Sequence, residues 1–206
     1  MAVLITLTVI FLALCINEIW WRLKKRRSEL SRKSIHIVIG VYTSFWPFYL
    51  SFTEIKALSI ACIVVMVVSK RLNIFKAIHE VDRVSWGEIL AVLSIAIMAF
   101  LTSSKWLFAT SILQMALADG LAALIGLKFG RSNSYKVFGS QKSLIGSLVF
   151  FITSLLILVI FQSLGHIGHS LVYLGLTSLV ATALENLGVK GLDNLFVPLA
   201  VLLMIS

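Results

Sequence analysis

Long apolar runs separated by short charged segments restrict this chain to a membrane fold. Of its 206 residues, 59% are hydrophobic and only 13% are charged, and the mean hydropathy is +1.01. These values lie far outside the range of soluble domains. The apolar runs cover residues 3–21, 35–50, 57–69, 89–101, 106–127, 144–164, 171–187 and 195–205. We therefore predict an all-α, polytopic membrane helical bundle of seven or eight transmembrane helices, with residues 1–206 forming a single domain. The third, fourth and eighth runs are short for a full span.

The basic residues fall on alternate connections between these runs. Segments 22–33, 70–87, 128–143 and 188–193 hold sixteen of the eighteen Lys and Arg residues, and the other connections hold only Lys56 and Lys105. Positive residues collect on the cytoplasmic side of membrane proteins. We expect an integral membrane protein whose N-terminus lies outside. The net charge of +9 is confined to these connections, which argues against a nucleic-acid partner.

Asp119 lies within the apolar run 106–127. A carboxylate inside a spanning helix is costly and usually faces the bundle interior or a wet cavity, which predicts an ion, phosphate or proton site. Ala123, Gly126 and Gly130 follow Asp119 on the same helical face. Such a stripe also suits close helix packing, but packing alone leaves Asp119 unexplained.

Most other polar residues at the ends of the runs fall, like Asp119, in the predicted cytoplasmic half. They are Glu18, His36, Glu88, Glu185, Asp193 and Asn194. Tolerated polar residues would scatter over both halves of the membrane. We therefore predict a site at the cytoplasmic interface.

The segment 128–143 predicts a phosphate-binding loop before the next helix. It holds four cations, two glycines and, just before the next helix, the hydroxyls of Ser140 and Ser143: the cations are Lys128, Arg131, Lys136 and Lys142, and the glycines are Gly130 and Gly139. Gly146 follows in the helix. Glycines let backbone N–H groups approach phosphate oxygens, lysines supply charge, and a helix N-terminus attracts anions. The spacing is not that of a Walker A loop.

Two further groups extend the candidate site. Arg32, Lys33, His36 and Gly40 share one helical face, either as a membrane-surface anchor or as ligands for a phosphate. Near the other end, Asn194 precedes a helix that Pro198 should kink, an arrangement that suits a polar ligand.

The acidic residues near that helix have two interpretations each. Asp193 is either a helix N-cap or a metal ligand. Glu185 either neutralises Lys190 or serves as a second metal ligand beside Asp119.

Five ordered motifs resemble the CTP-dependent polyprenol and phytol kinase family, which includes dolichol kinases and related bacterial membrane proteins. The similar segments are Arg32-Lys33-Ser34-Ile35-His36 with Gly40, Ser85-Trp86-Gly87-Glu88, the Asp119-Gly120 helix through Gly126 and Gly130, Lys142 through Ser147, and Glu185 with Gly191 to Asn194 and Pro198. Ile145 stands where many members have Glu. The resemblance covers most of the chain.

The resemblance implies a phosphotransferase that acts on an alcohol group. It would transfer the γ-phosphate of CTP, assisted by Mg²⁺, to a membrane isoprenoid alcohol of the phytol, polyprenol or dolichol type, or to diacylglycerol. Asp119 would bind the metal or accept the hydroxyl proton, with Lys142 and His36 as the other catalytic residues and Glu185 and Asp193 as metal ligands. The nucleotide would contact Lys33, Lys128, Gly130, Arg131, Lys136, Gly139, Ser143, Gly146 and Asn194. We expect a prokaryotic plasma membrane enzyme with a cytoplasmic active site.

Two other functions remain open on the sequence. A phosphatidate cytidylyltransferase also joins CTP to a lipid with Mg²⁺, but it releases pyrophosphate rather than CDP. An ion-coupled transporter would use Asp119 to bind a coupling ion, although a transport path needs polar residues in the outer half as well.

Overall fold

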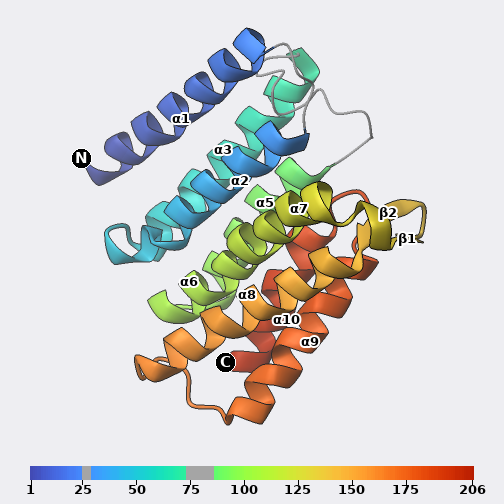
Figure 1. Ribbon diagram of the computed structural model, residues 1–206. Coiled ribbons are helices and arrows are strands. Elements are labelled where there is room, and N and C mark those ends of the chain that lie inside the picture. The colour runs from blue at the N-terminus through green and yellow to red at the C-terminus, as the bar shows by residue number, and fades with distance from the viewer. Residues whose placement is uncertain (25–28, 73–85) are drawn as a thin grey trace.

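The computed structural model describes residues 1–24, 29–72 and 86–206, which form a helical bundle with one small hairpin (Figure 1). Residues 25–28 and 73–85 lie outside the described part, and with them part of the basic segments 22–33 and 70–87 and Ser85 of the second motif. The helices are α1 (Ala2–Lys24), α2 (Glu29–Ser44), α3 (Phe52–Leu72), α5 (Gly87–Leu101), α6 (Lys105–Leu113), α7 (Asp119–Phe129), α8 (Leu144–Ser163), α9 (Leu171–Leu187) and α10 (Asp193–Ile205). Short helical turns η1 (Trp46–Phe48), η2 (Gln114–Ala118) and η3 (Arg131–Asn133) connect some of them.

Each apolar run of the sequence forms a helix, so the predicted helical architecture is confirmed. Four segments of the described chain are long and apolar enough to cross a membrane: Ala2–Trp20, Phe52–Ser69, Lys105–Phe129 and Leu144–Ser163. The third run was expected to be short, but α3 extends to 21 residues. α5, α9 and α10 are shorter apolar helices. The count of seven or eight spans stays a prediction.

The segment Lys105–Phe129 is the central helix of the bundle. Within its most apolar window 72% of the residues are buried, against 11% for the first span. α6 passes through the π-helical turn η2 into α7, and this continuous segment contacts α2, α8 and α10. Its buried alanines, such as Ala109 and Ala116, let neighbouring helices approach closely, as small residues do in membrane bundles. Asp119 therefore lies on the most enclosed of the four candidate spans in the described chain.

Glycines set the close contact between α2 and this central helix. A Cβ atom on Gly40 would lie 2.4 Å from the Cβ of Ala116, and one on Gly120 would lie 2.2 Å from a side-chain carbon of Ile37. Neither glycine could carry a side chain without the helices moving apart. This contact brings the polar face of α2 against the start of α7.

The sequence prediction for α2 differs from the structure in its boundaries. The apolar run begins at residue 35, but the helix begins at Glu29 and ends at Ser44, followed by η1 around Pro47. His36 therefore lies two turns inside the helix rather than at its start. The charged residues Arg32 and Lys33 extend the helix because their side chains are buried against the bundle.

The segment 128–143, predicted as a loop, forms the end of α7, the turn η3 and a β-hairpin. β1 (Ser134–Val137) pairs antiparallel with β2 (Ser140–Ser143). Phe138 and Gly139, between the strands, both have positive φ, 45° and 80°, as a two-residue hairpin turn requires. The hairpin lies at the end of the bundle away from both chain termini (Figure 1). The all-α architecture holds, and the hairpin corrects only the loop predicted for this segment.

Candidate active site

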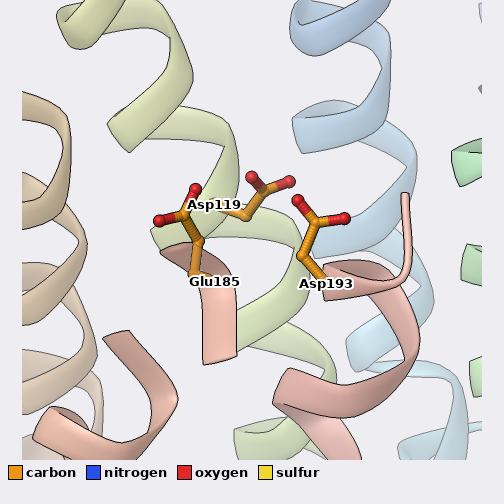
Figure 2. A group of neighbouring side chains, drawn as sticks. All are labelled: Asp119, Glu185 and Asp193. Carbon is orange, nitrogen blue, oxygen red and sulfur yellow. The ribbon is translucent and has the colours of Figure 1, made fainter. Parts of the chain in front are cut away.

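Three carboxylates from different helices meet beside the hairpin. Asp119 begins α7, Glu185 lies in the last turn of α9, and Asp193 begins α10. One oxygen of each lies within 4.8 Å of the others, and their side chains gather in one place (Figure 2). Asp119 is only 3% exposed. The structure thus brings together the three residues predicted as metal ligands.

Two lysines lie directly against these carboxylates. Lys33 Nζ is 2.6 Å from Asp119 Oδ2. Lys142 Nζ is 2.5 Å from Glu185 Oε1 and 3.9 Å from Asp193 Oδ2. It also donates to the backbone carbonyl of Glu185 at 2.6 Å. Buried charges are tolerated only when they are paired in this way. Burial opposes the charged form of Lys142, but the carboxylates of Glu185 and Asp193 outweigh burial and raise its pKa.

His36 lies beside Asp119 rather than on an open surface. Its Nε2 is 3.1 Å from the carbonyl oxygen of Met115 and 3.7 Å from Asp119 Oδ2. Met115 belongs to the π-helical turn, where the wider backbone turn leaves carbonyl groups accessible to side chains. His36 is not among the residues that line the cavity described below. Its position suits a residue that orients Asp119, whereas the sequence analysis had placed it in a catalytic role.

A cavity of about 790 Å³ opens onto the carboxylates. The predicted stripe of α7, Asp119, Ala123, Gly126 and Gly130, forms one wall. The remaining wall comes from the hairpin, the start of α8, the end of α9 and the segment 188–194, with Arg32 and Lys33 from α2. The cavity therefore combines carboxylates, cations and backbone of small residues, which is the chemistry that a phosphorylated ligand with a metal requires.

Ser143 holds the hairpin, α7 and α8 together at the edge of this cavity. Its hydroxyl accepts a hydrogen bond from the backbone N–H of Gly146 at 3.1 Å and so caps α8. A Cβ on Gly130 would lie 2.3 Å from this hydroxyl, and one on Gly126 or Gly146 would lie 3.0 Å from it. These glycines are thus required for packing as well as for lining the cavity.

The segment before α10 is fixed against the start of α5. Trp86 N donates to the carbonyl of Lys190 at 3.0 Å, and Asn194 Nδ2 donates to the carbonyl of Gly87 at 2.8 Å. A Cβ on Gly191 would lie 2.3 Å from Gly87 Cα. The motifs at residues 86–88 and 191–194, far apart in sequence, therefore form one unit that sets the position of Asp193.

The structure contradicts one alternative for Glu185 and one for Asp193, and their role as metal ligands stays a prediction. Glu185 pairs with Lys142 and not with Lys190. Asp193 is the first residue of α10, and Leu192 occupies the cap position. Asp193 Oδ1 accepts a hydrogen bond from the backbone N–H of the neighbouring Asn194 at 3.2 Å.

Not every residue predicted for nucleotide binding reaches the cavity. Arg131, Gly139, Gly130, Ser143, Gly146, Lys33 and Asn194 line it. Lys128 and Lys136 are exposed and do not line it, and Lys128 Nζ lies over the ring of Phe129 instead. The prediction for these two lysines treated the whole segment 128–143 as one phosphate-binding loop. The end of α7 and the strand β1 fix their side chains on other faces.

Sequence reasoning undervalued or missed several residues of the site. Arg32 lines the cavity and pairs with Glu88, with 3.3 Å between Nη1 and Oε1. Its position one residue before Lys33 could have indicated that Arg32 also belongs to the site. Ser147 also lines the cavity, and Tyr135 contacts it from the hairpin at 2.8 Å. No local pattern indicates the contact of Tyr135, because the hairpin itself was not predicted.

The donor set fits a hard divalent cation. Mg²⁺ prefers carboxylate and carbonyl oxygens, and Asp119, Glu185 and Asp193 supply three carboxylates in reach of one another. The Oδ1 atom of Asn194 is buried, has no hydrogen-bond partner among the residues that the structure describes, and belongs to a residue that lines the same cavity. An unpaired buried oxygen is costly unless a ligand satisfies it. These residues could therefore hold Mg²⁺.

Comparison with known proteins adds the family. The chain is 36% identical over 193 residues to a phytol kinase from Synechocystis sp., an alignment that covers 88% of this chain and 80% of the relative. The chain belongs to the phytol and polyprenol kinase family. Membership confirms the predicted enzyme class, a phosphotransferase. No family model matches the chain, and no solved structure matches it.

The motifs that resemble the phytol and polyprenol kinases meet around one cavity. Lys33 comes from the first, Asp119 from the third, Lys142 from the fourth and Asp193 from the fifth, and all line the cavity. Gly87 of the second motif contacts Asn194. Five segments that are separated in sequence thus have a common location.

Lys33→Met should raise the affinity of the ligand-free protein for a divalent cation. The ammonium group competes with a metal for Asp119, and its removal leaves the carboxylates less neutralised. We expect the apparent Kd for Mn²⁺, measured by electron paramagnetic resonance in detergent, to fall by about tenfold or more. Lys56→Met, which removes a lysine outside the cavity, should leave it unchanged. An unaltered Kd in folded Lys33→Met protein would contradict a metal site at Asp119.

Proposed function

We propose that this protein transfers the γ-phosphate of CTP to the hydroxyl group of a membrane isoprenoid alcohol of the phytol, polyprenol or dolichol type, with phytol as the first candidate. The observation that carries the proposal is the cavity in which Asp119, Glu185 and Asp193 face Lys33 and Lys142. The 36% identity to a phytol kinase supports the isoprenoid alcohol as acceptor. Diacylglycerol is a second acceptor for the same site.

The cations around the cavity would hold the phosphate groups. Phosphoryl transfer depends mainly on alignment and on neutralising charge on the transferred group. Lys142 and Arg131 approach from the hairpin side and Lys33 and Arg32 from α2. Gly139, in the hairpin turn, presents backbone without a side chain to the same space. Together they would clamp a triphosphate between α2 and the hairpin.

Asp119 would accept the proton of the lipid hydroxyl or bind Mg²⁺. Glu185 and Asp193 would complete the metal site, and Asn194 Oδ1 is a further oxygen in reach of the cavity. A bound Mg²⁺ would neutralise phosphate charge. Lys33 would hold Asp119 through their ion pair, and His36 would restrict its position, because both lie within 4 Å of its Oδ2 atom.

The membrane arrangement explains why one site could admit both substrates. The nucleotide comes from the cytosol and the alcohol from the bilayer. We propose that the single domain 1–206 spans the membrane seven or eight times, with the N-terminus outside and the cavity at the cytoplasmic face of a prokaryotic plasma membrane. Sixteen of eighteen basic residues then lie inside.

The products of the reaction test the proposed function. Purified protein with CTP, Mg²⁺ and phytol should release CDP and form phytyl phosphate, and ATP in place of CTP should support less turnover. Parallel reactions with a polyprenol and with diacylglycerol would rank the acceptors. Pyrophosphate release with phosphatidate as acceptor would indicate a cytidylyltransferase instead, and uptake of a solute without nucleotide turnover would indicate a transporter.

Asp119→Asn should abolish phosphorylation while the protein still inserts. The amide cannot accept a proton and is a poor metal ligand, so we expect kcat to fall by about 10³-fold or more. Glu54→Gln is the control, because Glu54 is an exposed acid outside the cavity that bonds Ser51. Turnover of the Asp119→Asn variant at the wild-type rate would exclude Asp119 from the reaction.

Orientation can be tested with two single cysteines in a variant that lacks Cys15 and Cys62. Ser132, in η3, and Ser163, at the end of α8, are both exposed and are expected on opposite sides. In intact cells a membrane-impermeant maleimide should label Ser163→Cys, and it should label Ser132→Cys only after permeabilisation. The reverse pattern would place the cavity outside.

A further inference from the structure

The β-hairpin that carries Lys142 needs an attachment of its own. Its two strands have four residues each, and an isolated hairpin of this size is marginally stable at best. Lys142 reaches α9 through the carboxylate and the backbone carbonyl of Glu185. If the ammonium group of Lys142 leaves Glu185 for a phosphate group, both contacts to α9 are lost. The hairpin must nevertheless stay in place, because it carries Lys142.

Tyr135 supplies a separate attachment next to Lys142. The two residues lie opposite each other in the register of the hairpin. The Tyr135 hydroxyl donates to the side-chain oxygen of Asn186 and lies 2.8 Å from the Ser147 hydroxyl. Asn186 follows Glu185 directly on α9. The hairpin is therefore held at two adjacent points of α9, one charged and one neutral.

The acceptor group of this contact is itself fixed. Asn186 Nδ2 donates to the carbonyl of Thr182 one turn earlier at 2.9 Å, which directs its oxygen toward the hairpin. The Ser147 hydroxyl lies 2.8 Å from the same oxygen. Side chains from β1, α8 and α9 thus meet at the Asn186 oxygen, which can accept from both hydroxyls, and this group contains no carboxylate or lysine. The contact between Tyr135 and Asn186 therefore does not depend on the charge that Lys142 would give up to a ligand.

We propose that Tyr135 is a positioning residue for the phosphate donor, which holds the hairpin on α8 and α9 so that Lys142 can exchange Glu185 for a phosphate oxygen. The inference rests on the proposed function of Lys142. Tyr135 touches neither substrate. It affects CTP binding by fixing the position of Lys142, which lies opposite it in the hairpin.

Tyr135→Phe, which removes only the hydroxyl, tests this role. We expect the KM for CTP to rise about five- to tenfold, as the loss of one part-buried hydrogen bond implies, while the KM for phytol stays within about twofold. Tyr173→Phe is the matched control, because the Tyr173 hydroxyl donates to the carbonyl of Met204 at 2.7 Å and does not line the cavity. It should change neither constant.

A double variant separates positioning from a general structural effect. In a Lys142→Met background, adding Tyr135→Phe should change the KM for CTP by less than about twofold. The effects of two substitutions do not add when one residue acts through the other. For variants with slow turnover, the Kd for CTP, measured by equilibrium dialysis, replaces the KM. The proposal is overturned if Tyr135→Phe leaves the KM for CTP unchanged, raises both KM values alike, or has its full effect without Lys142. If the Lys142→Met single variant kept the wild-type KM or Kd for CTP, that result would instead refute the role of Lys142 in the proposed function.

Discussion

Charge balance inside an apolar bundle is the constraint on which this structure depends. Asp119 is buried on the most enclosed of the four candidate spans in the described chain, and its ion pair with Lys33 keeps the carboxylate ionised there. Breaking such a pair by removing one partner costs about 3–5 kcal/mol. Lys142 performs the same task for Glu185. The glycines at the α2 contact and the docking of the hairpin both serve to bring these lysines to the carboxylates.

The same balance suits a site for a metal and a triphosphate. In the ligand-free protein the two lysines neutralise carboxylates, and a bound metal would take over that role. The lysines would then be free to neutralise phosphate oxygens in the same cavity. One set of residues can therefore remain paired before and after ligand binding, which limits the cost of holding charged groups beside lipid.

The backbone contributes as much to this site as the charged side chains. The π-helical turn η2 immediately precedes Asp119 and gives His36 a carbonyl partner in Met115. Gly191 packs on Gly87, and Asn194 bonds the carbonyl of the same residue. These contacts set where α7 and α10 begin, and each of the two helices begins with a carboxylate of the site.

Hydropathy and the cost of a buried carboxylate are properties of local sequence. They predicted the helices and a group of polar residues, with Asp119, Glu185 and Asp193 among them, near one face of the membrane, and the family resemblance added the three carboxylates as metal ligands. Other features depend on contacts between distant segments, and only the tertiary structure decided them. The start of α2 at Glu29, the hairpin at 134–143 and the exclusion of Lys128 and Lys136 from the cavity are of this kind. A lysine in a basic segment looks the same in sequence whether it faces the cavity or the solvent. Its direction is set by the helix or strand that carries it and by what that element packs against.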